Sequence, residues 1–325
     1  MHVWLCENPT GVEALEWTEL PTPEPKPGEV RVKIAAASLN FPDLLIVQNK
    51  YQMKPALPFV PGSEYAGRVD AVGAGVEHLK VGDAVAAFGG TGGFATHACV
   101  SAGLVMPLPA GFALDEASAF ILTYGTTHHA LVDRAALKPE ETVLVLGAAG
   151  GVGTAAIQIA KALGAHVIAA ASTDAKCELC KQLGADATLN YTGANIREQI
   201  KTLTGGKGPD VVYDPVGGDL AEPVFRSIAW RGRYLVIGFA QGGIPALPMN
   251  LALLKGASLV GVFWGEFARR EPKANAKSLA ELARWYGEGK IKPVIDRKLP
   301  MTELPQAFAL MSTRTVRGKL VLTND

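Results

Sequence analysis

Apolar and polar side chains follow two different patterns along this chain, and the first is typical of β structure. Residues 28–39 (GEVRVKIAAASL) begin with alternating polar and apolar positions, as a half-buried strand does. Residues 65–88 continue with two or three short apolar runs that are separated by glycines. Prolines crowd residues 21–27 and 55–61, which favours turns over helices. This part of the chain therefore predicts a compact β domain.

From about residue 123 the pattern changes to strands that alternate with helices. Buried strands are predicted over 142–147, 166–171, 187–189, 210–214, 233–238 and 258–263. Helices are predicted over 151–163, 174–184, 274–287 and 302–313, before a final strand, GKLVLTN. Alternating strands and helices predict a parallel sheet that is covered on both faces.

The turn between the first of these strands and its helix is rich in glycine. It reads GAAGGVG over 147–153, with Gly150, Gly151, Val152 and Gly153 at the start of the helix. The first N–H groups of a helix are free and lie at the positive end of its dipole, so a pyrophosphate binds there if no Cβ blocks it. Gly150 permits that approach and Gly153 permits close helix packing, which predicts a dinucleotide site. The alternative is a turn that only lets the helix pack.

The residues after the second strand indicate which dinucleotide is bound. An NAD site has an acid there for the ribose 2′-hydroxyl, whereas this chain has Ser172 and Thr173. Asp174 follows and is expected to cap the next helix. Ser172 and Lys176 can instead bind a 2′-phosphate, so the predicted cofactor is NADPH. Lys176 could also be an ordinary solvated lysine.

Composition excludes several classes of partner. The 325 residues carry 31 basic and 31 acidic side chains, which favours neither nucleic acid nor an acidic membrane surface. No apolar run reaches the ~18 residues of a membrane span. Four cysteines are too few for a disulfide framework, and the first residues do not resemble a secretory signal. We expect a soluble, cytoplasmic protein.

Several motifs together resemble the zinc-free quinone oxidoreductases related to zeta-crystallin, within the medium-chain dehydrogenase/reductase superfamily. The matching stretches are SLNFPD (38–43), LPFVPGSEYAGRV (57–69), VGDAV (81–85), LTYGTTHHAL (122–131), GAAGGVG (147–153), LGADATLNY (183–191), VVYDPVGG (211–218) and GRYLVIGF (232–239). The resemblance covers essentially the whole chain.

This resemblance implies an α/β fold in which a doubly wound Rossmann domain is inserted into a mainly-β, GroES-like catalytic domain. The catalytic domain would consist of residues 1–122 and 265–325, and the Rossmann domain of residues 123–264. The active site would lie in the cleft between them. Relatives commonly form dimers through an edge of the Rossmann sheet, so a homodimer through the strand at 258–263 is expected.

The resemblance also implies further cofactor contacts. Tyr191 would complete the 2′-phosphate site with Ser172 and Lys176. The residues expected along the nicotinamide half are Thr127, Gly238, Phe239, Val262, Phe263 and Trp264. For Phe263 and Trp264, plain core packing is the alternative.

Zinc enzymes of the same superfamily differ from this chain at their metal ligands. Their first catalytic Cys corresponds to Asn40, and their Gly-His-Glu corresponds to Gly62-Ser63-Glu64, where only the acid remains. The segment FGGTGGFATHACV has one cysteine where a structural zinc needs four. We therefore expect neither metal.

Without a Lewis acid, the substrate should accept hydride readily, as quinones and conjugated enones do. Asn40, Asp43 and Tyr51 flank the former metal position in the family. Asn40 could donate an amide hydrogen bond to the substrate oxygen, Tyr51 a hydrogen bond or proton, and Asp43 would orient its neighbours. A purely structural turn is the alternative. Two other functions stay open: an enoyl- or acryloyl-CoA reductase, and a non-catalytic protein that binds NADPH.

Three other groups of residues have less specific interpretations. Cys177 and Cys180 lie within a predicted helix, which favours a structural role over redox chemistry. His128 and His129 have no carboxylate nearby in the sequence, so structural or surface roles are expected. Arg269 and Arg270 are expected on a solvated surface, or else on an acidic handle such as a coenzyme A phosphate.

Overall fold

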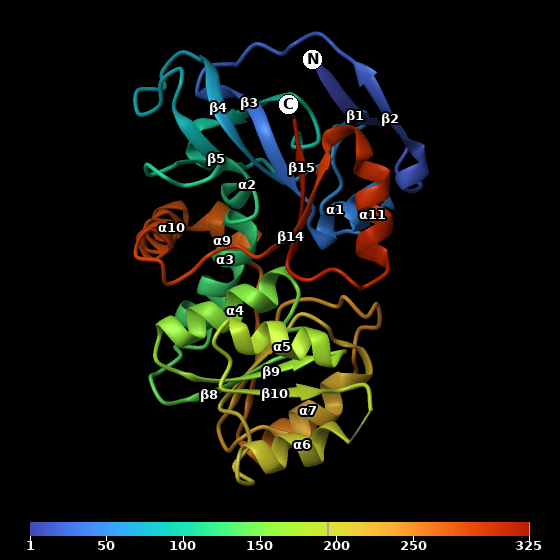
Figure 1. The fold of residues 1–325 in the computed structure, drawn as a ribbon, viewed down its shortest axis with the longest axis vertical. Coiled ribbons are helices and arrows are strands. Elements are labelled where there is room, and N and C mark those ends of the chain that lie inside the picture. Colours follow the sequence, from blue (N-terminus) through green and yellow to red (C-terminus); the bar gives the residue numbers. More distant parts are fainter. Residues whose placement is uncertain (194, 325) are drawn as a thin grey trace. The chain divides into compact units, whose positions relative to one another are not determined.

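The computed structural model describes residues 1–193 and 195–324, and their contacts divide the chain into two compact units. Residues 1–122 and 293–325 form the first unit, and residues 123–292 form the second. The blue N-terminal and red C-terminal segments in Figure 1 both belong to the first unit. The second boundary follows Lys292, whereas the sequence placed it after residue 264. The helices between these two positions make their contacts within the second unit.

The first unit is built on β strands, as the alternation of apolar residues predicts. A two-stranded ribbon pairs β1 (His2–Cys6) with β2 (Leu15–Glu19). The larger sheet has the order β14-β15-β3-β4-β5-β7, with β6 paired to β3. Its strands are β3 (Glu29–Ser38), β4 (Glu64–Val72), β5 (Ala84–Phe88), β6 (His97–Ser101), β7 (Val105–Pro107), β14 (Ile295–Pro300) and β15 (Lys319–Thr323).

The C-terminal strand β15 lies in the middle of this sheet rather than at its edge. It pairs antiparallel with β3 and parallel with β14, so the two ends of the chain share one sheet. Short helices cover the sheet: α1 (Phe41–Val47), α2 (Leu114–Ala117) and α11 (Leu304–Ser312), with 3₁₀ turns at Val12–Ala14, Ala102–Leu104 and Met301–Glu303.

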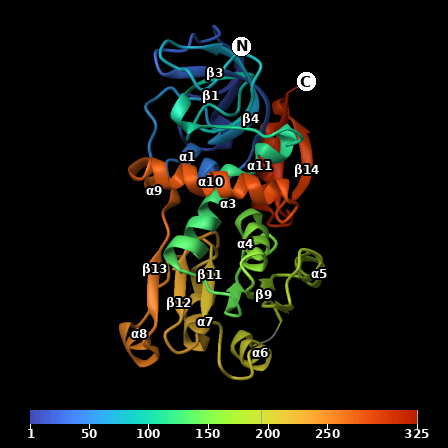
Figure 2. The same cartoon turned by 90° about the vertical axis from the view of Figure 1, so that its left-hand side faces the viewer.

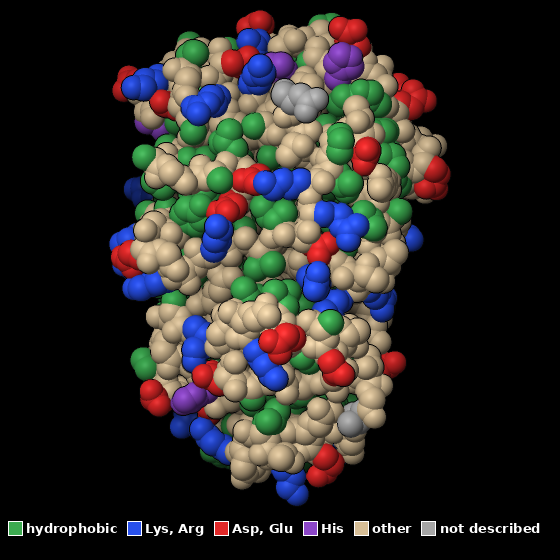
Figure 3. Space-filling view, in the orientation of Figure 1, with side chains coloured by type: hydrophobic (Ala, Val, Ile, Leu, Met, Phe, Trp, Pro, Cys, Tyr) green, Lys and Arg blue, Asp and Glu red, His purple; other side chains and the backbone are tan. Residues whose placement is uncertain are grey.

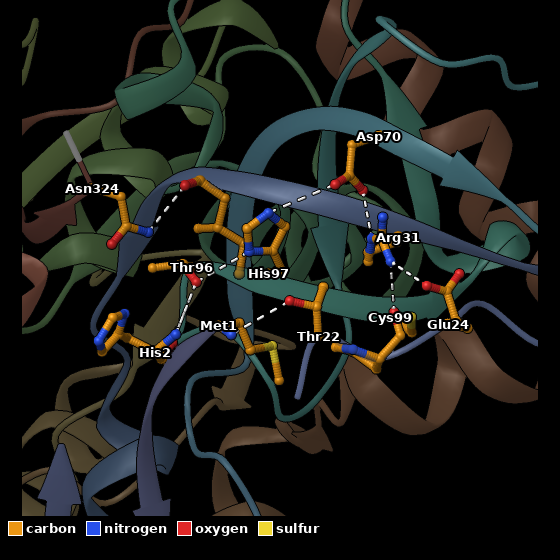
Figure 4. A network of polar contacts seen from close by, with 12 residues as sticks. Met1, His2, Thr22, Glu24, Arg31, Asp70, Thr96, His97, Cys99 and Asn324 are labelled. Carbon is orange, nitrogen blue, oxygen red and sulfur yellow. Dashed lines mark hydrogen bonds and ion pairs between the residues drawn. The ribbon is translucent and has the colours of Figure 1, made fainter. Parts of the chain in front are cut away.

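A network of hydrogen bonds and ion pairs joins the proline-rich segment around Pro23 and the C-terminal Asn324 to this sheet (Figure 4). Arg31 on β3 donates to Asp70 at 2.9 Å and to the Pro23 carbonyl at 3.0 Å. The Asn324 amide donates to the backbone carbonyl of Ala95 at 2.9 Å. These bonds satisfy backbone groups that the irregular segments leave unpaired.

The second unit contains the parallel sheet that the sequence predicts. Six strands run in the order β10-β9-β8-β11-β12-β13, and every pair is parallel. They are β8 (Thr142–Val145), β9 (His166–Ala171), β10 (Ala187–Asn190), β11 (Val211–Asp214), β12 (Arg233–Val236) and β13 (Ser258–Gly261). The strand order reverses between β8 and β11, which is where doubly wound folds bind ligands. The fold class is thus confirmed: a mainly-β GroES-like unit and a Rossmann unit.

Helices connect these strands, and others precede β8 or follow β13. They are α3 (Ile121–His128, which begins at the boundary), a π-helix (His129–Arg134), α4 (Gly151–Ala162), α5 (Asp174–Gln182), α6 (Ile196–Leu203), α7 (Ala221–Ser227), α8 (Met249–Lys255), α9 (Trp264–Arg270) and α10 (Pro272–Gly287), with a 3₁₀ turn at Gly218–Leu220. Figure 2 shows β11, β12 and β13 side by side, with α8 near the start of β13.

Charges of both signs are interspersed over the face drawn in Figure 3, consistent with the equal numbers of acidic and basic residues. No helix among residues 1–193 and 195–324 combines the length and apolar character that a membrane span requires.

Candidate functional site

The glycine turn of the second unit crosses the carboxyl edge of its sheet. Leu146 donates its N–H to the Tyr213 carbonyl on β11, and Ala148 donates to the Ala170 carbonyl on β9, both at 3.0 Å. The first helical hydrogen bond of α4 runs from Thr154 N–H to the Gly150 carbonyl at 2.8 Å. The N–H groups of residues 151–153 therefore precede the hydrogen-bond ladder and are available to an anion.

Two glycines of this turn have different spatial roles. A Cβ on Gly153 would lie 2.4 Å from the Gly147 carbonyl oxygen, so only glycine lets α4 approach the turn. A Cβ on Gly150 would have its nearest neighbour at 3.3 Å, and its φ of −83° suits any residue. The Gly150 position is therefore less tightly enclosed than that of Gly153, which fits a position that a ligand must approach.

The residues expected to bind a 2′-phosphate follow two adjacent strands. Ser172 comes directly after β9 and Tyr191 directly after β10, and the Tyr191 N–H donates to the Ala171 carbonyl at 3.1 Å. Lys176 lies in the first turn of α5 and is half-buried. The edge where β9 ends thus combines a hydroxyl, a phenol and an amine without an acid directly after the strand.

The cap of α5 differs from the prediction. Thr173 is the N-cap, and its hydroxyl oxygen accepts a hydrogen bond from the Lys176 N–H at 3.3 Å. Asp174, predicted to be the cap, is the first helical residue and accepts from the Asn190 amide at 2.9 Å. The acid therefore joins α5 to β10 instead of capping the helix.

The remaining cofactor candidates follow the strands on the other side of the switch point. Gly238 and Phe239 come after β12, and Val262 and Phe263 come after β13. All four are at least partly accessible, and Phe263 is 58% exposed. These residues thus share the carboxyl edge of the sheet with the glycine turn.

Thr127 and Trp264 are both buried within the second unit. The Thr127 hydroxyl donates to the Thr123 carbonyl at 2.7 Å and lies 2.9 Å from the Tyr213 hydroxyl. The Trp264 indole N–H donates to Asn275 at 3.0 Å, and its ring packs where a Cβ on Gly125 would lie. Trp264 is 4% exposed, so in this structure it packs in the core, the alternative weighed for it.

In the first unit, Asn40 and Asp43 form the start of helix α1. The Asp43 carboxylate accepts the Asn40 N–H at 2.8 Å, as an acid at the third helical position commonly does. Its other oxygen accepts the Ser63 N–H at 3.0 Å, which joins α1 to the segment before β4. Asp43 thus orients its neighbours, and both Asn40 and Asp43 are buried.

The Asn40 amide is held in one orientation by two charged neighbours. Its oxygen accepts from the Lys319 ammonium, and its nitrogen donates to the Glu64 carboxylate at 3.3 Å. An ammonium only donates and a carboxylate only accepts, so the opposite orientation would lose both bonds. Glu64 also accepts from the Ser38 hydroxyl at 3.2 Å and from the Leu122 N–H at 2.9 Å. In this structure the amide is thus engaged within the protein.

Burial shifts the pKa values of this cluster, and the ammonium opposes part of the shift. Burial raises the pKa of Asp43 to about 6, although backbone N–H bonds and Lys319 lower it. Burial also raises the pKa of Glu64, and lowers that of Lys319. The phenol of Tyr51 is half-buried, and burial followed by the Asp43 charge raises its pKa. Tyr51 therefore keeps its proton over a wide pH range.

Sequence reasoning missed Lys319 altogether and treated Glu64 only as a remnant of the zinc pattern. The lysine begins the predicted strand GKLVLTN, where a polar first residue is unremarkable. Its pairing with β3 brings it beside Asn40, and no local pattern carries that information.

A catalytic zinc does not fit these side chains. The positions of the zinc ligands hold an amide and a hydroxyl, and the adjacent carboxylate faces a lysine, whereas zinc favours thiolate and imidazole. Across residues 1–193 and 195–324, no cluster of three or more His, Cys, Asp or Glu side chains is arranged to hold a metal.

Both histidines of the LTYGTTHHAL segment have carboxylate partners, which the sequence analysis did not expect. His128 lies 2.9 Å from Glu281 on α10, and His129 lies 2.9 Å from Asp133, four residues later in the π-helix. The His129 ring also stacks on Phe267 with a centroid distance of 4.1 Å. Both histidines are buried and do not lie on the surface. His128 links α3 to α10, and His129 links the π-helix to α9.

Two other candidate groups have structural roles. Cys177 and Cys180 are buried in α5, and burial raises both thiol pKa values, that of Cys180 to about 12. Such thiols are poor nucleophiles. Arg269 and Arg270 are both paired with Glu266 on their own helix, at 2.6 and 2.5 Å.

Comparisons with known proteins match both units. The family described as alcohol dehydrogenase GroES-like domain matches residues 26–110, and zinc-binding dehydrogenase matches residues 151–282. Quinone oxidoreductase-like protein 2 of Bos taurus is 39% identical over 304 residues, which cover 93% of this chain and 87% of the relative. A quinone oxidoreductase of Pseudomonas aeruginosa is 35% identical, with 96% of each chain covered.

The structural comparison gives the same answer. The quinone oxidoreductase of Thermus thermophilus, solved alone and in complex with NADPH, matches with a TM-score of 0.87 and 34% identity, and all of each chain is covered. Because the likeness extends over nearly the whole chain and includes both units, this protein belongs to the medium-chain dehydrogenase/reductase superfamily, among the enzymes of the quinone oxidoreductase family.

Proposed function

We propose that this protein is an NADPH-dependent reductase that transfers hydride to quinones or conjugated enones without a metal. One observation carries the proposal. The carboxyl edge of the Rossmann sheet presents the free N–H groups of residues 151–153, and Ser172, Lys176 and Tyr191 follow the adjacent strands with no acid directly after β9. This arrangement suits a dinucleotide with an extra phosphate.

Each group at this edge has a specific role in the proposal. The backbone N–H groups of Gly151, Val152 and Gly153 bind the diphosphate, and Gly150, whose own N–H donates to the Gly147 carbonyl at 2.9 Å, lets the diphosphate approach. Ser172, Lys176 and Tyr191 bind the 2′-phosphate. The nicotinamide half lies along Gly238, Phe239, Val262 and Phe263, while Thr127 and Trp264 support that region from the core.

The reaction consumes one hydride and one proton for each quinone or enone reduced. NADPH supplies the hydride when it is bound. The protein provides the proton for the resulting oxyanion from the Tyr51 phenol, whose raised pKa keeps it protonated. Asn40 and Asp43 hold the start of α1 in place, because their polar groups are already engaged with neighbours.

The test follows the oxidation of NADPH and NADH by a panel of quinones, enones and acyl-CoAs, with and without a metal chelator. We expect rapid oxidation of NADPH with quinones or enones, slow use of NADH, and no effect of the chelator. Turnover of acyl-CoAs alone would assign a thioester reductase instead. Tight NADPH binding without any turnover would indicate a non-catalytic protein, and loss of activity with chelator would contradict the metal-free site.

Lys176→Met tests the cofactor preference directly. Loss of one charge-assisted contact to the 2′-phosphate should raise the KM for NADPH about 10- to 100-fold and leave the KM for NADH unchanged. Lys181→Met is the matched control, because Lys181 lies on the same helix and is exposed. Equal effects of Lys176→Met on both cofactors would exclude a phosphate contact at this position.

We also propose that the protein is a homodimer through the free edge of β13. That strand pairs with β12 alone among the described strands of the sheet. Beside it in the sequence, α8 exposes Met249 at 90%, Leu253 at 77% and Leu254 at 65%. Large exposed apolar side chains grouped on one short helix favour association with a second copy.

A further inference from the structure

A lysine lies in the interior of the first unit, beside Asn40 and Glu64, the residues that the resemblance aligns with zinc ligands. Lys319 begins β15 and is 6% exposed. Its ammonium donates to the Leu39 carbonyl at 2.7 Å and to the Asn40 amide oxygen. Burying an ammonium has a large desolvation cost, which only hydrogen bonds and opposite charges can offset.

The opposite charges come from two buried carboxyl groups. Glu64 on β4 is fully buried and Asp43 on α1 is 1% exposed. Burial raises the pKa of both carboxyl groups and lowers that of Lys319, and the attraction between the opposite charges offsets part of each shift. Asn40 lies between the lysine and Glu64, and one side chain bonds both.

We propose that Lys319 is the resident cation of the candidate site: its ammonium fixes the orientation of the Asn40 amide and of the Glu64 carboxylate, and so acts as a positioning residue for the start of α1. An effect of Lys319 on turnover rests on the proposed function. Its effect on the orientation of Asn40 and Glu64 does not, and stability measurements test that effect separately.

The hydrogen-bond polarity of the cluster makes the proposal testable. In Glu64→Gln, the NH₂ group of the glutamine has to point at either the Leu122 N–H or the Asn40 NH₂, so two hydrogen-bond donors face each other. The Asn40 amide cannot rotate to offer its oxygen instead, because that oxygen is held by Lys319. In Lys319→Met, Glu64 loses its cation while it stays buried. When both residues are changed, the Asn40 amide can rotate and accept from the glutamine that replaces Glu64, and no charge of this pair is left buried.

The experiment is a double-mutant cycle in thermal stability, on the full-length protein. Each single variant should lower the Tm by on the order of 10 °C, and the double variant should recover at least about half of that loss. Lys298→Met is the control, because Lys298 on the neighbouring β14 forms an exposed ion pair with Asp115. Its Tm should change by no more than about 2 °C.

The pH dependence separates a charge effect from lost packing. The groups that interact with Lys319 are Glu64 from β4 and Asp43 and Asn40 from α1 and its cap. Ser38 from β3 bonds Glu64, and Tyr51 lies beyond Asp43. Without the lysine, the pKa of Glu64 in the folded protein rises further above its unfolded value. The Lys319→Met variant is then most stable at low pH, where Glu64 is protonated, and it loses stability as the pH rises through the pKa of Glu64 in the folded protein. The Tm difference between wild type and Lys319→Met should therefore widen from about pH 5 to about pH 8.

Kinetics test the positioning role. Lys319→Met should lower kcat by about 10-fold or more, while the KM for NADPH stays within about two-fold, because the cofactor residues lie in the other unit. If Lys319→Met does not fold, the double variant provides the stability and kinetic measurements, with kcat still reduced.

Three results would overturn the proposal: additive losses in the cycle, a Tm difference that does not change with pH, or an unchanged kcat in Lys319→Met. An inactive wild-type protein would contradict the proposed function only, since the thermal cycle still decides whether Lys319 fixes Asn40 and Glu64.

Discussion

Burial separates the polar residues near helix α1 into two kinds. Asn40 and Asp43 are buried and hydrogen-bonded within the protein, so their polar groups serve the fold in this structure. Tyr51 is half-buried, and its phenol has a pKa raised by burial and by Asp43. Among the three residues proposed from the sequence, Tyr51 is therefore the one best suited to meet a substrate.

Tyr51→Phe tests this assignment. Removal of the phenolic proton should lower kcat with quinones or enones by about 100-fold or more, because the oxyanion loses its acid, while the KM for NADPH should not change. Steady-state kinetics measure both values.

The control is Tyr286→Phe, which alters a half-buried tyrosine on α10 in the other unit and should leave kcat unchanged. A Tyr51→Phe enzyme with wild-type kcat would remove Tyr51 from the mechanism.

At the scale of elements, the strand–turn–helix unit from β8 to α4 contains two glycines, Gly150 and Gly153, whose surroundings differ. The turn is bonded to β9 and β11, which places the start of α4 over the switch point of the sheet. Gly153 is required for α4 to pack, whereas a Cβ on Gly150 would make one tight contact, 3.3 Å from the Gly147 carbonyl oxygen. Packing and cofactor access can therefore be separated by substitution.

Gly150→Ala and Gly153→Ala should have different effects. In Gly150→Ala the Gly147 carbonyl has to shift by only a few tenths of an ångström, so the Tm should fall less than in Gly153→Ala, while NADPH binding weakens because the methyl group lies where the diphosphate approaches. In Gly153→Ala the overlap with the Gly147 carbonyl should cost about 1–3 kcal/mol of stability. Thermal melts and NADPH titration measure the two effects. Unimpaired NADPH binding by Gly150→Ala would contradict the proposed position of the diphosphate.

At the scale of the whole molecule, β13 is a terminal strand of the Rossmann sheet and pairs with β12 alone among the described strands. Helix α8 is anchored by the buried Leu251 and ends at Gly256 in a left-handed conformation, yet most of its apolar side chains face outward. Leu259 on β13 adds to this apolar surface. A second copy that covers this edge would remove the exposed apolar area and complete the sheet.

Leu253→Glu tests the dimer. The wild type should have twice the monomer mass, and the variant should be monomeric at micromolar concentration, because a carboxylate in an apolar interface is costly to desolvate. Size-exclusion chromatography with light scattering measures the mass. Leu203→Glu on α6, another exposed leucine of the same unit, should remain dimeric. A monomeric wild type would contradict the proposed assembly.

Local patterns in the sequence are sufficient to predict the strands and the helix on either side of the glycine turn. The apolar periodicity of 142–173 and its glycines predict β8, α4 and β9 to within a few residues, because these elements depend on local spacing. The carboxyl edge of the sheet then collects the residues after each strand, since all the strands are parallel.

Which charged side chains are buried together depends on how distant segments of the chain pair and pack. Lys319 meets Asn40 because β15 pairs with β3, and His128 meets Glu281 because α10 packs beside α3. The partners are distant in sequence, so no local pattern records them. Burial of a charge is a property of the assembled core, and it is what gives Lys319, Glu64 and Asp43 their interactions.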